Sequence, residues 1–423
     1  MKPVKHLRWG IVAILFCSTT INYIDRQTLS VLSPVIMQEL HLNHVDYSRI
    51  VSAFQVTYAL TWLVGGVFLD IVGTRLGLAL AIIWWSVAGM LTSLGRSVAS
   101  LAFFRFLLGI GEGCNWPAAN KTVAEWFPAR ERGVAVAIFD SGSSVGGILA
   151  PPLVAAIASA WGWRMAFIFT GMLGFFWVAI WLAVYRPLRS HPAVTAEERH
   201  LIESGREMAT VSAPGGVRRW LSLLKDRNVW GIVLGRSLTD PIWWFYVFWL
   251  PQYLSDVRGF SLKQIGAFGW IPFVASAVGN YTGGWASMLL IKRGMPVLRA
   301  RKWVCVVSSL PILAGIPAAL TGNAYLAIAL ISVATWSYAS WSTMGLTFPS
   351  DLFPHDVVAS VTGLSGLGAG LAGALFTTIV GVIVEKFSYF PAFVAAGVVP
   401  MLATVCVLVL IRAPKKEGPG TGD

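Results

Sequence analysis

The stretch "GGVFLDIVGTRLG", residues 65–77, joins two charge-free apolar runs, 50–69 and 76–95. A segment needs about 20 mostly apolar residues to cross a bilayer as a helix. Both runs meet that length, and the polar stretch between them is short. These residues therefore predict two membrane-spanning helices joined by a tight, charged loop.

The loop itself has the pattern Gly66-x-x-x-Asp70-x-x-Gly73-x-Arg75. Glycines permit a close approach of helices and a tight turn, while Asp70 and Arg75 can pair with each other or cap neighbouring helix ends. The simpler interpretation is a loop that only carries positive charge. We expect instead that the four residues hold the two helices close together at a tight turn.

The composition extends this prediction to the whole chain. Of its 423 residues, 56% are hydrophobic and 12% are charged, about half the charge of an average soluble protein. The basic N-terminus leads into an apolar run too long for the core of a signal peptide, so we interpret it as the first helix. The four cysteines form no metal-binding or disulfide pattern, and we expect neither metal nor cofactor.

The hydropathy pattern predicts an all-α membrane protein with twelve transmembrane helices. Charge-free runs cover 50–69, 76–95, 165–185, 264–291, 357–384 and 387–411. The run 303–350 is long enough for two spans and breaks at "TGNA", residues 321–324. Four further apolar stretches are interrupted by charge: 9–38, 97–120, 133–160 and 228–255.

One long polar connection divides the chain into two halves of six helices. We expect an N-terminal half (1–185), a cytoplasmic central loop (186–227), a C-terminal half (228–412) and a cytoplasmic tail (413–423). The loop contains "HPAVTAEERHLIESGREM", which predicts a surface helix, and "VSAPGG", which is typical of a linker.

The two halves also repeat in sequence. "FPARERG" at 127–133 has a counterpart "FPHDVVA" at 353–359, and "AFIFTG" at 166–171 has one in "AFVAAG" at 392–397. Both pairs are offset by the same number of positions. Two parallel six-helix halves imply a pseudo-two-fold axis along the membrane normal, with a central site between them.

The distribution of Lys and Arg predicts the orientation in the membrane. If the N-terminus is cytoplasmic, most of the 32 basic residues fall on the cytoplasmic side. The outer loops then hold only Arg49, Arg96, Arg164, Arg258, Lys263 and Lys386. Both termini are therefore expected in the cytoplasm. The net charge of +12 marks that face of the protein and does not indicate a nucleic-acid partner.

Several charged residues fall inside predicted helices, where a charge must face protein or water. They are Asp25, Arg26, Arg105, Glu112, Asp140, Arg236 and Asp240. Arg105 and Glu112 are two helical turns apart, about 10.5 Å, so we expect both to face a central cavity. A fixed cation there attracts an anionic substrate, and a carboxylate in low dielectric can hold a proton. For Asp140 and Arg236 we expect a structural ion-pair role.

Polar and aromatic residues in mid-helix are candidates for contacts to a sugar. Tyr23, Tyr58 and Trp341 can stack on a sugar ring or bond its hydroxyls, and Asn22 has hydrogen-bonding capacity. Asp240 precedes Pro241, which breaks the backbone ladder, so it is a candidate hinge, hydroxyl acceptor or second proton site. Ser143 lies in a small-residue stretch that favours helix packing but is within reach of a substrate. The alternative for each is packing between helices.

Five stretches resemble a known family. The pattern at 66–75 resembles the loop signature of the major facilitator superfamily, which implies that Gly66, Asp70, Gly73 and Arg75 gate the cytoplasmic side. "NYIDRQTLSVLSP" (22–34), "RFLLGIGEGCNWPAANKTVAEWFPARERG" (105–133), "LTDPIWWFYVFWLPQYL" (238–254) and "LKQIGAFGWIPF" (262–273) are similar to the anion:cation symporter family within it, most of all to bacterial hexuronate transporters.

This resemblance implies proton-coupled import of a sugar acid. By analogy with the galactonate transporter of that family, it implies that Asp25 and Glu112 handle protons. It also places Arg26, Arg105 and Tyr58 in the cavity. The helix at 357–384 lacks an asparagine, and the helix at 133–160 a glutamine, that are expected in the galactonate protein. Both departures favour a different sugar acid.

The sequence thus predicts a proton:hexuronate symporter, specific for galacturonate or glucuronate and working by alternating access. It is expected as a monomer in the lipid bilayer of a bacterial inner membrane, with no enzymatic activity. The alternatives are symport of another organic anion such as galactonate or glucarate, and efflux of a cationic drug, which cavity arginines disfavour. A receptor that binds a sugar acid without transport is a rival from another class, and a membrane enzyme is a third.

Overall fold

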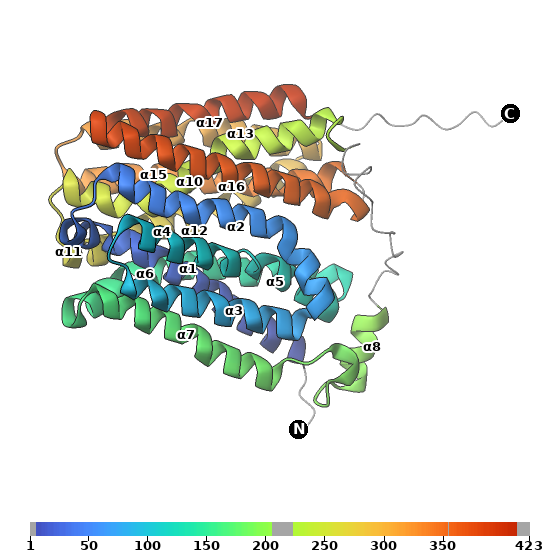
Figure 1. Ribbon diagram of the computed structural model, residues 1–423. Helices are drawn as coiled ribbons and strands as arrows, with labels where there is room; N and C mark the ends of the chain where they lie inside the picture. The colour runs from blue at the N-terminus through green and yellow to red at the C-terminus, as the bar shows by residue number, and fades with distance from the viewer. Residues whose placement is uncertain (1–5, 205–222, 354, 413–423) are drawn as a thin grey trace.

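The computed structural model describes residues 6–204, 223–353 and 355–412. Its regular structure in these ranges is a bundle of long helices that run side by side (Figure 1). A helix satisfies its own backbone hydrogen bonds, as every segment in hydrocarbon must. The predicted all-α membrane fold class is therefore confirmed.

The first half of the chain forms the helices α1 to α7. They are α1 (Leu7–Leu40), α2 (His44–Val72), α3 (Thr74–Leu91) with the short η1 (Thr92–Leu94), α4 (Val98–Glu112), α5 (Asn115–Trp126), α6 (Ala129–Trp161) and α7 (Trp163–Val184). Side-chain caps begin two of them. Asn43 and Asp46 form a capping box at α2, and Ser97 and Ser100 form another at α4.

The connection and the second half follow. They comprise η2 (Leu188–Ser190), α8 (Ala196–Ser204), α10 (Arg227–Asp256), α11 (Leu262–Phe268), α12 (Ile271–Lys292), α13 (Val297–Ser309), η3 (Pro311–Ala314), α14 (Gly315–Leu320), α15 (Ala324–Leu352), α16 (His355–Lys386) and α17 (Phe390–Leu410). The predicted break at 321–324 separates α14 from α15, and Asn323 caps the start of α15.

All twelve predicted spans fall on helical residues, but the helices differ in continuity. By length and apolar composition, eight described segments can each cross a membrane, or nine if α2, bent by 56°, counts as one span. The predicted spans outside this set are α4–α5, α10 and α11–α12. The first breaks at Gly113–Cys114, and the third breaks at Gly269–Trp270. Charges at Arg236 and Asp240 interrupt the apolar run of α10.

The internal repeat reappears in the helix boundaries. α6 begins at Ala129 and α16 at His355, which are 226 positions apart. Gly142 of α6 lies against α1, where an added Cβ would be 2.4 Å from the carbonyl oxygen of Phe16. Its counterpart Gly368 lies against α10 in the same way, 2.7 Å from Ser237 Oγ. Equivalent helices therefore cross closely in both halves.

The loop within residues 65–77 is a tight turn, but only part of its predicted contacts form. Gly73 ends α2 with φ of +83°, a conformation that favours glycine. Asp70 pairs with Lys121 of α5 at 2.7 Å and not with Arg75. Arg75 donates to the carbonyl of Leu182 and so caps the end of α7. Gly66 has no heavy atom within 4 Å of an added Cβ, so its predicted role in close helix approach is wrong.

The central loop packs on the first half. Arg8 at the start of α1 donates to Glu198 of α8 at 2.7 Å and to Glu131 of α6 at 2.9 Å. α8 is thus the predicted surface helix, held at one end of the bundle. The predicted linker at 211–216 lies outside the described residues.

The bundle has two ends, which we name by their short helices. α1 begins and α17 ends at the α8 end, and α11 marks the opposite, α11 end (Figure 1). Hydrogen bonds between the halves gather toward the α11 end. Ser30 donates to the carbonyl of Val247 at 2.5 Å, Ser33 to Gln252 at 3.0 Å, and Tyr47 to the carbonyl of Phe248 at 2.7 Å. The two halves are therefore closed on each other at the α11 end.

The close crossing of α1 and α6 makes a test of the fold. We expect Gly142→Ala to destabilise the protein by about 1–3 kcal/mol, the usual range for overpacking, because its methyl group meets a backbone oxygen. The apparent melting temperature of the purified protein measures this. Gly133→Ala is the matched control, since nothing lies within 4 Å of its Cβ. Equal melting of both variants would contradict the packing.

Candidate functional site

A cavity of about 410 Å³ lies between the two halves and is the candidate site. Its size fits the range of about 300–1,000 Å³ typical of small-molecule sites. Both halves contribute to its wall, from α1, α2, α5 and α6 on one side and from α10, α12, α15 and α16 on the other. Among the predicted site residues, those on its wall are Tyr23, Arg26, Tyr58, Ser143 and Asp240.

Arg26 of α1 is the cation on the wall of the first half. Its Nε and Nη2 donate to the same carboxylate oxygen of Glu112, at 3.1 and 2.9 Å, and Nη2 also donates to Asn22 Oδ1 at 3.0 Å. The side chains of Arg26 and Glu112 are only 1% and 0% exposed. A charge so deeply buried is tolerated because its partner is buried with it.

Aromatic rings surround the Arg26 guanidinium. Its Cζ lies 4.7 Å from the ring centre of Tyr23, 4.5 Å from that of Tyr58 and 5.3 Å from that of Trp244. Cation–π attraction at such distances stabilises a desolvated arginine. Trp244 comes from α10, so rings from both halves meet over one cation of the first half.

The sequence around Glu112 explains how a carboxylate reaches this depth. An added Cβ at Gly109 or Gly113 would clash with α2, at 2.1 Å from Thr57 Oγ1 and 2.6 Å from Thr61 Cβ. At Gly111 it would clash with α3, at 2.7 Å from Trp85. The alternating glycines let α4 approach both helices and enclose Glu112 completely.

Arg105 and Glu112 do not face the cavity together, contrary to the sequence expectation. Neither lines it, because α1 stands between them and the cavity. Arg105 lies 5.1 Å from the Phe167 ring of α7, and its Nη1 is 3.5 Å from the backbone oxygen of Asp25. Within the described part of the chain, neither oxygen of the buried Asp25 carboxylate has a hydrogen-bond partner.

The wall of the second half carries its own ion pair. Arg236 Nη2 lies 2.7 Å from Asp240 Oδ2, and Arg236 also donates to Ser365 Oγ at 3.1 Å. Tyr338 donates to Asp240 Oδ1 at 3.2 Å. We expected a structural ion-pair role for Arg236; it forms an ion pair with Asp240, and it also lines the cavity. The sequence signal for this pair is the four-residue spacing of Arg236 and Asp240, which places both charges on one helix face.

The remaining predicted residues are placed less directly. Asn22 lies behind Arg26 and not on the cavity wall. Trp341 is fully buried and does not line the cavity, because its indole packs against α10 and donates to Thr404 of α17. Asp140 lines the cavity and accepts from Trp116 Nε1 at 3.0 Å.

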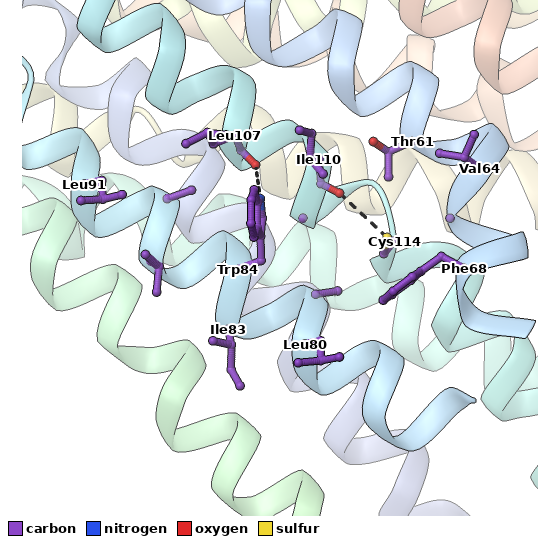
Figure 2. A pocket seen from close by; sticks show the side chains of 15 residues that line it. Thr61, Val64, Phe68, Leu80, Ile83, Trp84, Leu91, Leu107, Ile110 and Cys114 are labelled. Carbon is purple, nitrogen blue, oxygen red and sulfur yellow. Dashed lines mark hydrogen bonds between the residues drawn. The ribbon is translucent and has the colours of Figure 1, made fainter. Parts of the chain in front are cut away.

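A second hollow, of about 610 Å³, lies between α2, α3 and α4 (Figure 2). None of its fifteen lining residues is charged, and several, including Val64 and Leu80, are half exposed on the outside of the bundle. In Figure 2 the Trp84 indole donates to the Leu107 carbonyl, at 2.8 Å. This hollow offers no group that recognises an anion, so the smaller central cavity is the candidate site.

Comparison with known proteins agrees with this architecture. The family model described as Major Facilitator Superfamily matches residues 15–377. The hexuronate transporter of Escherichia coli K12 is 33% identical over 413 residues, which cover 97% of this chain and 96% of that protein. The galacturonate transporter of Dickeya chrysanthemi is 34% identical over 330 residues, 78% of this chain and 96% of that protein.

A solved structure supports the same fold. The inward open conformation of the xylose transporter XylE from E. coli superimposes with a TM-score of 0.71 at 16% identity, over 97% of this chain and 98% of that one. The chain therefore belongs to the major facilitator superfamily and is a multi-pass membrane transport protein rather than an enzyme.

Proposed function

We propose that the protein is a proton-coupled symporter that imports a hexuronate, galacturonate or glucuronate, by alternating access. The observation that carries this proposal is the Arg26–Glu112 pair at the edge of a cavity between two halves. The printed names of the relatives, hexuronate and galacturonate transporters, favour the same substrate class.

The proposed mechanism is a competition for one cation. Glu112 occupies two donors of Arg26, and a substrate carboxylate needs the same bidentate donors. When Glu112 takes a proton, its hold on Arg26 weakens and the guanidinium is free to bind the substrate. Release of that proton restores the pair and expels the anion. Proton uptake and substrate binding are thereby linked through the same group.

Asp25 and Arg105 extend this mechanism behind α1. We assign Asp25 as a second proton site, because its buried carboxylate oxygens have no partner among the described residues and an isolated buried charge is costly. Arg105 lies beside it and supplies positive charge to the proton sites from behind the wall. In this proposal Arg105 acts through Asp25 and not by direct contact with substrate.

The rest of the cavity suits a sugar. Tyr23 and Tyr58 offer ring faces and hydroxyls, and Ser143 and Asp240 offer hydrogen bonds to sugar hydroxyls from opposite halves. The Arg236–Asp240 pair provides a charged, hydrogen-bonding surface on the cavity wall of the second half. Another sugar acid, such as galactonate or glucarate, is the alternative substrate, and a receptor without transport is the alternative class.

The distribution of Lys and Arg supports an orientation in a bacterial inner membrane in which the α8 end and both termini face the cytoplasm. The protein works as a monomer in this proposal. Since contacts close the α11 end, the described state has its outer side shut. Gly66, Asp70, Gly73 and Arg75, at the α8 end, then belong to the cytoplasmic gate.

Uptake of labelled galacturonate into proteoliposomes with an inward proton gradient tests the coupling. We expect wild type to accumulate substrate uphill and Glu112→Gln to exchange it without accumulation, because the variant cannot release a proton. Glu39→Gln, at an exposed carboxylate of α1, is the matched control. Uphill accumulation by Glu112→Gln would disprove its role. A wild type without hexuronate flux under any gradient would disprove the substrate, and a screen of other sugar acids would follow.

Equilibrium binding separates the two arginines. We expect Arg26→Lys to weaken hexuronate binding by about 10- to 100-fold, since hydrogen bonds to charged groups contribute about 1.5–3 kcal/mol and lysine cannot bind bidentately. Arg105→Lys is expected to change affinity much less but to shift the pH profile of uptake. Titration calorimetry measures both affinities. Equal losses in the two variants would place Arg105 in direct contact with the substrate.

A further inference from the structure

A histidine joins the two halves at the α11 end. His44 is the first residue of α2, and its Nε2 lies 2.9 Å from Asp256 Oδ2 at the end of α10. Its Nδ1 lies 2.8 Å from Glu385 Oε2 near the end of α16. One side chain of the first half thus bridges two carboxylates of the second half.

The protonation state of His44 follows from these contacts. An ionised carboxylate only accepts hydrogen bonds, and a neutral imidazole has one donor nitrogen and one acceptor nitrogen. Both ring nitrogens face carboxylate oxygens, so both must donate, and only the imidazolium does so. The described arrangement therefore contains a positive His44 between two negative charges.

Other hydrogen bonds hold the carboxylates in place. Asp256 accepts from Tyr389 at 2.8 Å and from Gln252 at 2.8 Å, and Gln252 in turn accepts from Ser33 of α1. Glu385 also accepts the backbone N–H of His44 at 3.0 Å. The cluster is continuous with the contacts that close the α11 end.

The other charged or titratable groups on the neighbouring elements do not replace His44. Asp46 and Arg49 of α2 pair with each other, and Glu39 of α1 pairs with Arg164 of α7. Lys386 follows Glu385 at the end of α16, and Tyr389 donates to Asp256. Trp249 of α10 stacks on the imidazole at 6.4 Å. Within the described chain, His44 is the cation bonded to both carboxylates.

We propose that His44 is a gating residue of the transport cycle, and that its imidazolium holds the two halves together at the α11 end. Loss of its proton leaves one donor between two facing carboxylates, whose repulsion then favours separation of the halves. Imidazole changes charge between about pH 5 and 8, so opening of this end depends on the pH of the solution that bathes it. The pH-dependent opening itself follows from the contacts of His44. Only its assignment to a transport cycle rests on the proposed function.

Distances between spin labels across the α11 end test the gate without substrate. Leu94 of the first half and Phe387 of the second are 62% and 77% exposed. They serve as labelling positions after Cys17, Cys114, Cys305 and Cys406 are replaced. In nanodiscs, wild type is expected to show one short distance at pH 5.5 and a growing population of longer distances at pH 8.5.

Variants distinguish a titrating cation from a merely structural contact. His44→Gln should show the longer distance at both pH values, and His44→Arg, a cation that does not titrate in this range, the shorter one at both. Asp256→Asn combined with Glu385→Gln should remove the pH dependence, whereas Glu39→Gln should behave as wild type. A wild-type distribution that is independent of pH, or a His44→Gln distribution identical to wild type, would overturn the proposal. Neither result depends on hexuronate flux, so the proposed function fails or stands separately.

Discussion

The buried pair of Arg26 and Glu112 constrains the structure around the cavity. Two charges that are almost inaccessible to solvent are stable there only as an ion pair. Removal of one partner from such a pair typically destabilises a protein by about 3–5 kcal/mol. The pair ties α1 to α4, and the glycines of α4 and the rings around Arg26 are arranged to accommodate it. Whatever separates the two charges has to supply a replacement partner for each of them.

The second ion pair gives the cavity a polar wall on each half of the chain. Arg236 and Asp240 face it from α10, while Trp244 of the same helix reaches Arg26 of the first half. A ligand between these walls therefore contacts both halves at once. The halves are bonded mainly near the α11 end, through residues such as Tyr47 and His44. Contacts at that end and contacts to a ligand in the cavity would therefore both join the two halves.

Much of the fold was predictable from the sequence, because helices in a membrane are selected by length and hydropathy alone. The "TGNA" break separates α14 from α15, and the offset between the halves reappears in the starts of α6 and α16. Helix breaks and helix contacts were predicted less well where packing against adjacent helices decides them. The break at Gly113–Cys114 and the lack of contact at Gly66 depend on how closely α2, α3 and α4 approach, which hydropathy does not report.

The sequence by itself determined which charges lie within membrane helices and which helices carry them, since Asp25, Arg26 and Glu112 interrupt apolar runs. Only the tertiary structure decided their partners. Spacing along a helix relates residues of that helix alone, so it can relate Arg236 to Asp240 but not Arg26 to Glu112, 86 positions away. It could not place Arg105 behind α1 or Trp341 against α17, because the wall of a cavity is made by helices that are distant in sequence.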